Sequence, residues 1–271
     1  GGVPPAELRA LLDAAVAAQA TGAVDVVGIW SHLAWADAPD HPTVHAQAVV
    51  FRDAVALAEK AGAHLEVRHL ANSAATLTNP AMGFDLVRPG LAVFGLTPVP
   101  QLGGPERFGL VPAMRLEAEL VLAKRVPAGH GVSYGHEYVT DRETVLGVVP
   151  LGYADGVPRH ASGTHGRPGA PVQVGGRRLG IAGRVCMDQF VVDLGPGAVE
   201  EAGDVVVLFG AGTDGEPTAE DWAVACDTIS YEIVTRLGVR VPREYRGDAA
   251  LLAAAGGGGG RGASSSSCPT P

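Results

Sequence analysis

Cysteine is scarce in this sequence, and none of its cysteines forms a paired motif. Only Cys186, Cys226 and Cys268 occur among the 271 residues, and no CxxC pair is present. This usage fits a reduced compartment better than a disulfide framework. We therefore expect a cytoplasmic protein whose fold depends on a hydrophobic core, to which 46% of its residues can contribute.

Positive charge and long apolar runs are also scarce. The net charge is -9, and no block rich in lysine or arginine offsets it, which argues against binding to nucleic acid or to an acidic membrane. The longest uncharged run, residues 89 to 105, is interrupted by prolines and glycines and would not form a membrane-spanning helix. The start of the sequence shows no signal-peptide pattern. The expected ligand is a small molecule.

The two ends of the sequence are unusual. It begins with Gly1-Gly2 rather than methionine and continues directly into a helical pattern, as if an earlier part of a domain had been removed. Residues 248 to 271 contain runs of glycine and serine that cannot form a core, so we expect this tail to be disordered.

The first part of the chain alternates between helical and strand patterns. Two strands with helices before and between them are followed by a helix start and a third strand, which predicts parallel strands with helices outside and polar residues at the carboxyl ends of the strands. α/β barrels carry their chemistry at that edge. The expected helices begin after Pro4-Pro5, at Thr43 and within residues 71 to 77, and the expected strands cover 24 to 29, 65 to 70 and 84 to 87. The helix from Thr43 carries an apolar stripe at the helical 3,4 spacing, formed by Val44, Ala48, Phe51, Val55 and Ala58.

The pattern changes at about residue 114. Short strand-like runs follow, separated by Gly, Pro and Asp turns: LEAELVLAKRV, TVLGVVPLG, RLGIAGRV, DQFVVDL and DVVVLFG. A helical pair then begins with a capping-box-like start at Thr218 and Asp221 and ends at Gly238. We therefore predict an α/β domain over residues 1 to 112, a separate, mainly β domain over 113 to 247, and the tail.

Three polar clusters in the α/β half could bind a ligand. His32 lies at a strand exit, where an ordinary rim histidine is the simpler interpretation. Asn72-Ser73 starts a helix and could bind a phosphate, although ordinary helix capping is at least as common. At Arg88-Pro89-Gly90 a glycine would allow an anion to approach the backbone. Two such sites on consecutive late strands strengthen the phosphate hypothesis.

Seven motifs in order resemble the alanine racemase family. Each motif is weak alone, but together they extend over both halves of the chain to about residue 247. They are DVVGIWSHLAWAD, RHLANSAATL, FDLVRPGLAVFGL, GVSYGHEY, VPLGYADGVPR, AGRVCMDQFVVDL and ISYEIVTRLGVRVPREY. The resemblance implies the C-terminal part of a (β/α)8 TIM-like barrel followed by a mainly β domain, with pyridoxal 5'-phosphate as cofactor and alanine as substrate, and no metal.

The resemblance assigns the cofactor site to the α/β half. Arg88 matches the residue that faces the pyridine nitrogen, and because arginine stays protonated, that nitrogen would remain unprotonated and the ring would be a weaker electron sink. His32 matches the link between Arg88 and the catalytic tyrosine, and His69 and Asn72 match supporting positions. The matches to the phosphate cradle are Ser73, Tyr231 and the backbone N–H groups of Gly90 and Leu91.

The resemblance assigns the catalytic group to the β half. Tyr134 matches the base on the L-amino-acid face, and because a free tyrosine has a pKa of about 10, its phenolate would need stabilisation, for which Arg88 and His32 are candidates. Met187 matches the backbone N–H that binds the substrate carboxylate, with Asp188 holding its loop. Tyr153 matches an entrance position, although a packed strand tyrosine is an equally good interpretation. In the family, the tyrosine and the methionine reach the other subunit's cofactor, which implies a homodimer with shared sites.

One feature of the family pattern is missing. Racemisation needs a second base, which in this family is the lysine that also holds the cofactor. The chain has two lysines, Lys60 and Lys124, and neither stands in that motif, so we assign both to solvated faces. We therefore expect a fragment that retains three of eight barrel strands, is unstable and inactive alone, and belongs to an active full-length enzyme that supplies D-alanine for peptidoglycan.

Two other functions remain open. The full-length protein could racemise another amino acid, such as serine or lysine. Alternatively, a protein without the lysine could bind pyridoxal phosphate or a partner without catalysis.

Overall fold

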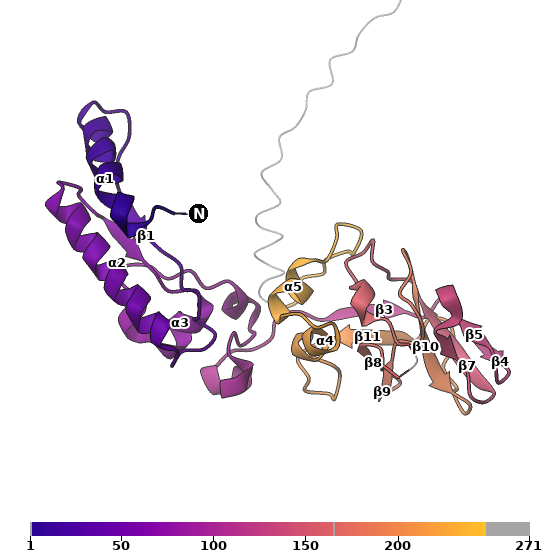
Figure 1. The fold of residues 1–271 in the computed structure, drawn as a ribbon. Helices are drawn as coiled ribbons and strands as arrows, with labels where there is room; N and C mark the ends of the chain where they lie inside the picture. Colours follow the sequence, from indigo (N-terminus) through magenta and orange to yellow (C-terminus); the bar gives the residue numbers. More distant parts are fainter. Residues whose placement is uncertain (1, 165, 248–271) are drawn as a thin grey trace, which may run out of the picture.

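The protein forms two lobes that lie at opposite ends of an elongated molecule (Figure 1). The computed structural model describes residues 2–164 and 166–247. The predicted disordered tail, 248 to 271, lies outside the described residues, and so does Cys268. Within residues 2–164 and 166–247, no helix has the length and the hydropathy needed to cross a membrane.

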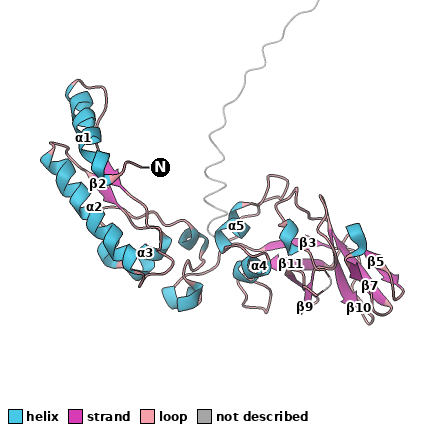
Figure 2. Cartoon of the chain, viewed as in Figure 1, coloured by secondary structure: helices cyan, strands magenta, loops and turns pink. Residues whose placement is uncertain are grey.

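The first lobe contains two parallel strands and three helices (Figure 2). β1 pairs with β2 in parallel, with Gly28 opposite Val67 and Trp30 opposite His69. The predicted apolar stripe of α2 is confirmed, because Val44, Ala48 and Phe51 are all buried. The elements are α1 (Pro5–Ala20), β1 (Gly28–Trp30), α2 (Pro42–Lys60), β2 (Val67–His69) and α3 (Ser73–Thr78).

Two strand predictions in this lobe are wrong. The expected buried strand at 24 to 29 is reduced to β1, and Val24 and Val27 are about half exposed. In the described residues β1 pairs only with β2, and of the remaining apolar positions only Val26 packs against a core, the cluster of Leu12, Ala58 and Ala63. The expected third strand at 84 to 87 is a turn with Phe84 at a φ of 47°, and only a parallel bridge from Arg88 to Asn72 remains.

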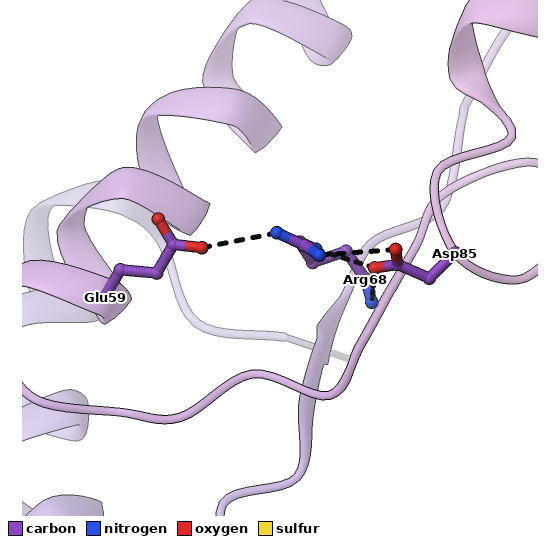
Figure 3. Close-up of polar contacts among 3 residues, drawn as sticks. All are labelled: Glu59, Arg68 and Asp85. Carbon is purple, nitrogen blue, oxygen red and sulfur yellow. Dashed lines mark hydrogen bonds and ion pairs between the residues drawn. The ribbon is translucent and has the colours of Figure 1, made fainter.

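An arginine holds that turn against the lobe (Figure 3). Arg68 of β2 donates through Nε to Asp85 Oδ2 at 2.6 Å, and its backbone N–H donates to the same oxygen at 2.8 Å. Its Nη1 also lies 3.3 Å from Glu59 Oε1 on α2. The pKa of Asp85 is lowered, first by the hydrogen bond from the Arg68 side chain. The turn therefore keeps its position beside β2 without pairing as a strand.

The second lobe consists mainly of strands, as predicted, and the strands pair in antiparallel fashion. One sheet has the order β10-β7-β4, a second has the order β3-β11-β8-β9, and β5 pairs with β6. β8 and the β5-β6 pair were missed by the sequence analysis. The strands are β3 (Leu116–Glu119), β4 (Leu122–Val126), β5 (Gly131–Val132), β6 (Tyr138–Val139), β7 (Thr144–Val149), β8 (Pro171–Val174), β9 (Arg177–Gly180), β10 (Phe190–Gly195) and β11 (Val205–Phe209).

Two short helices lie where the lobes meet (Figure 1). α4 (Ala219–Ala225) begins with the predicted capping box, in which Thr218 and Asp221 each accept a hydrogen bond from the other's backbone N–H. α5 (Ser230–Thr235) ends before the predicted stop at Gly238. The backbone N–H of Gly238 donates instead to Asp155 O, at 2.9 Å.

The segment between the lobes is a series of 3₁₀ turns. They cover Pro80–Met82, Leu91–Phe94, Pro100–Leu102 and Pro105–Phe108. Leu91 is buried in the large core of the second lobe, and Phe94 and Leu96 pack against that core. Val99 of the same segment is buried in the core of the first lobe, and Leu102 and Phe108 pack against that core. The linking segment is therefore attached to both lobes by burial of apolar side chains.

Candidate functional site

A pocket of about 700 Å³ lies between α3, the linking segment and the two C-terminal helices. Both lobes line it, because Ser230 and Tyr231 of α5 face it together with residues of the first lobe. The predicted cofactor-site residues that line it are His32, Asn72, Ser73, Arg88, Gly90, Leu91 and Tyr231.

Arg88 is held by a set of acceptors at the carboxyl ends of the two strands. Its Nη1 lies 2.6 Å from His69 Nδ1, and its Nη2 donates to Ser31 O at 2.8 Å and lies 3.3 Å from His32 Nδ1 and from Leu70 O. The pKa of His69 is lowered by burial and then by the Arg88 charge, so a neutral His69 can accept from the guanidinium. These contacts therefore hold the Arg88 guanidinium in one orientation.

Trp30 adds a second restraint on Arg88. The guanidinium carbon lies 5.3 Å from the Trp30 ring centroid, and the same ring stacks on His69 with 6.0 Å between centroids. Burial lowers the pKa of Arg88, but an aromatic face and a guanidinium attract each other and favour the charged form. The sequence analysis gave Trp30 no role.

A hydroxyl and two backbone N–H groups converge beside this arginine. Ser73 is buried, and its Oγ accepts from Gly90 N at 2.8 Å and from Ala92 N at 3.3 Å. Asn72 caps α3 by accepting from Ala75 N at 3.1 Å, as the simpler interpretation expected. Of the two N–H groups predicted for the cradle, that of Gly90 is one of these donors, whereas Ala92 was not predicted.

Tyr231 completes this side of the pocket from the second lobe. Its phenol is half-buried, and burial raises its pKa, with a smaller contribution in the same direction from the Asp37 carboxylate. The interaction with Ser73 lowers that pKa. Tyr231 and Ser73 therefore lie together although they belong to different lobes. Two carboxylates, Asp37 and Glu220, also line the pocket, and Glu220 accepts a hydrogen bond from Ser230.

Tyr134 lies in a strained and exposed turn of the second lobe. Its side chain is 70% exposed, and the residues around it have positive φ values, 60° at Ser133, 77° at Gly135 and 47° at His136. Ser133 Oγ donates to Arg184 O at 2.7 Å, which joins this turn to the segment that leads to Met187. Non-glycine residues with positive φ are uncommon and concentrate at functional sites, where the surrounding structure holds them.

Met187, Asp188 and Tyr153 lie near this turn. Ser133 Oγ is 3.3 Å from Cys186 Sγ, and Tyr153 N donates to Cys186 O at 3.0 Å. Met187 is 53% exposed and Tyr153 is 43% exposed. Tyr134, Met187 and Tyr153 are therefore an exposed group, and none of them lines the pocket that holds Arg88.

The predicted residues thus form two half-sites. The first is the Arg88 pocket. His69 also belongs to it, because the His69 ring contacts the Arg88 guanidinium. The second, the Tyr134 edge, consists of Tyr134, Tyr153, Met187 and Asp188. In the described part of the chain, no hydrogen bond joins Tyr134 to Arg88 or His32.

The lysines do not complete either half-site. Lys60 at the end of α2 and Lys124 in β4 are both exposed, as predicted. Across residues 2–164 and 166–247, no group of His, Cys, Asp and Glu side chains is arranged to hold a metal ion.

Sequence reasoning missed several partners of these residues. Arg240 pairs with Asp188 at 2.7 Å, and Arg184 forms an ion pair with Glu137 beside the Tyr134 turn. Arg240 lies in the motif ISYEIVTRLGVRVPREY, but its position in the sequence does not indicate which distant carboxylate it contacts.

Two family models match the chain. The model described as "Alanine racemase, N-terminal domain" matches residues 1–98, and "Alanine racemase, C-terminal domain" matches residues 113–245.

Curated relatives and solved structures agree with these matches. An alanine racemase of Beutenbergia cavernae is 64% identical over 89% of this chain, and one of Frankia casuarinae is 60% identical over 90%. The crystal structure of the alanine racemase of Streptomyces lavendulae superposes with a TM-score of 0.86, at 59% identity over 91% of this chain.

The chain spans less than two thirds of the proteins it matches. It covers 62% of each of the two curated relatives and 63% of the S. lavendulae structure.

Proposed function

Because the chain belongs to the alanine racemase family, we propose that the full-length protein interconverts L-alanine and D-alanine with pyridoxal phosphate. Its first lobe is part of the family's α/β barrel, and its second lobe is the family's β domain. The observation that carries the proposal is Arg88, whose guanidinium is fixed by His69 and Ser31 beside the Ser73 hydroxyl and the backbone N–H groups.

The residues in the Arg88 pocket fit this cofactor. The Ser73 and Tyr231 hydroxyls and the Gly90 and Leu91 N–H groups would hold the phosphate, and Asn72 supports the start of α3, which carries Ser73. The Gly90 and Ala92 N–H groups donate to Ser73 Oγ, so the Ser73 hydroxyl keeps its own proton for the phosphate. Arg88 would face the pyridine nitrogen and, because it stays protonated, leave that nitrogen without a proton. When bound, the cofactor supplies an electron-withdrawing ring that makes the Cα–H bond of the amino acid more acidic.

The Tyr134 edge would supply the proton transfer and the substrate contact. Tyr134 Oη takes the Cα proton on the L-alanine face or returns it, and the Met187 N–H binds the substrate carboxylate. Since Lys60 and Lys124 are exposed and outside both half-sites, the second base comes from residues other than these. Tyr153 lines the entrance and Asp188 supports the loop of Met187.

A second copy of the protein would bring the two half-sites together. Tyr134 is 70% exposed and does not line the Arg88 pocket of its own chain, which supports a homodimer in which each subunit's Tyr134 edge completes the other's pocket. His32, which lies 3.3 Å from Arg88, would then link the guanidinium to the incoming tyrosine and favour its phenolate.

The product would serve cell-wall synthesis. D-alanine is a component of peptidoglycan, and the scarcity of cysteine supports a cytoplasmic site of action.

The test is turnover by the full-length protein. With pyridoxal phosphate bound, as seen from its absorbance, we expect L-alanine and D-alanine to be interconverted, with a higher kcat/KM for alanine than for serine or lysine. Replacement of Arg88 by Gln removes the fixed positive charge, and we expect it to reduce turnover while cofactor binding persists. A parent protein that binds the cofactor without racemising alanine would contradict the proposal.

A further inference from the structure

Two turns of the second lobe are joined by their backbones. Tyr153 N donates to Cys186 O at 3.0 Å and Ala154 N donates to Met187 O at 2.9 Å. Gly152 makes this approach possible, because an added Cβ would lie 2.2 Å from Met187 O and 2.4 Å from Cys186 O. The orientation of the Met187 peptide therefore depends on the position of the 152 to 155 turn.

Arg240 connects the same two turns through side chains. Its Nε lies 3.1 Å from Asp155 Oδ1, and its Nη2 donates to Asp188 Oδ1 at 2.7 Å. The other oxygen of Asp155 accepts from Gly152 N at 2.8 Å. The Arg240 guanidinium thus contacts two carboxylates: that of Asp155, which shapes the 152 to 155 turn, and that of Asp188, which is next to Met187.

The Asp155 contact differs from an ordinary surface ion pair. The Asp155 side chain is only 5% exposed, whereas that of Arg240 is 53% exposed. A buried carboxylate needs a compensating charge, and losing that charge costs far more than losing an exposed pair. The planar fork of arginine can meet two carboxylates at once, which the single ammonium of lysine cannot do in the same geometry.

We propose that Arg240 is a positioning residue that holds the Met187 peptide in the direction needed for its N–H to meet the substrate carboxylate. The inference rests on the proposed function, which gives that N–H its ligand. The proposal gives Arg240 no contact with substrate or cofactor: it acts through Asp155, Asp188 and the two turns to which they belong.

The experiment compares Arg240 with a matched arginine in the full-length holoenzyme. Arg125 of β4 is the control, because it is 54% exposed, pairs with Glu143 at 3.2 Å and lies in the same lobe. Variants R240Q, R240K and R125Q are assayed for kcat and KM on both enantiomers of alanine. Hydrogen exchange at the amides of Tyr153 and Ala154 is measured in parallel, since their acceptors belong to the 186 to 187 peptide segment.

We expect R240Q to raise KM for both enantiomers about tenfold while kcat changes less than about threefold, because binding of the carboxylate is lost in the ground state and the transition state alike. Exchange at Tyr153 and Ala154 should accelerate. R240K should resemble R240Q rather than the parent, and R125Q should match the parent in both readouts.

Unchanged exchange in R240Q would overturn the inference. The inference would also be overturned if the parent racemises alanine and R240Q shows faster exchange but an unchanged KM. The turns would then be held for some other purpose. A parent that binds pyridoxal phosphate and does not racemise alanine is a failure of the proposed function instead, and the exchange data alone would then decide whether Arg240 holds the turns.

Discussion

At the scale of single residues, the chemistry depends on side chains whose neighbours come from distant parts of the sequence. Arg88 meets His69 and Ser31, and Ser73 meets Gly90, through contacts that no local pattern specifies. Residue types alone left His32 a rim histidine and Asn72-Ser73 a helix cap. Asn72 does cap α3, and the neighbouring Ser73 hydroxyl faces the linking segment. Only the ordered set of motifs pointed to a cofactor.

Replacing Tyr134 by Phe tests the role of its hydroxyl. In the full-length enzyme we expect exchange of the Cα proton of L-alanine to slow by about 100-fold or more, and that of D-alanine to be affected far less, because only the base on the L face is removed. Deuterium incorporation from D₂O, followed separately for each enantiomer, measures this.

Tyr245→Phe serves as the control, since Tyr245 is 62% exposed, comparable with Tyr134, and lies outside both half-sites. Equal loss of exchange from both enantiomers in the Tyr134 variant would count against two bases on opposite faces.

At the scale of elements, predictions succeeded where local signals were strong. Pro4-Pro5 and the apolar spacing predicted α1 and α2 closely, and Thr218 with Asp221 predicted the start of α4. The predictions failed for short strands, because a strand exists only through its partner. Residues 84 to 87 have the apolar composition of a strand, but Asp85 is bound by Arg68 and the segment turns.

A glycine between two elements gives the next prediction. In Gly152→Ala the new Cβ would overlap Met187 O and Cys186 O, both backbone atoms, so the two turns must separate. We expect a loss of stability of about 1–3 kcal/mol, together with a higher KM for alanine. Urea unfolding and steady-state kinetics measure these effects.

Gly197→Ala is the matched control, because a Cβ at Gly197 meets nothing within 4 Å. If Gly152→Ala were as stable as Gly197→Ala, the close approach of the two turns would not exist in solution.

At the scale of the whole molecule, the chain carries two incomplete half-sites. The Arg88 pocket holds the groups suited to a phosphate and a pyridine nitrogen, and the Tyr134 edge lies exposed on the second lobe. The change from α/β to β character was readable from periodicity. The proposal that the two half-sites act in one reaction came from the resemblance instead, because the spacing of residues in one chain does not show which of them would meet across a dimer.

Complementation between two impaired variants tests the proposed shared site most directly. Full-length Tyr134→Phe and Arg88→Gln subunits are prepared separately, then mixed, unfolded and refolded together, and formation of heterodimers is confirmed by native mass spectrometry. In each heterodimer one site combines an intact Arg88 with an intact Tyr134. The account predicts recovery of about a quarter of the parent activity from an equal mixture, since half of the dimers would each carry one complete site. Confirmed heterodimers with no more activity than the separate variants would contradict it.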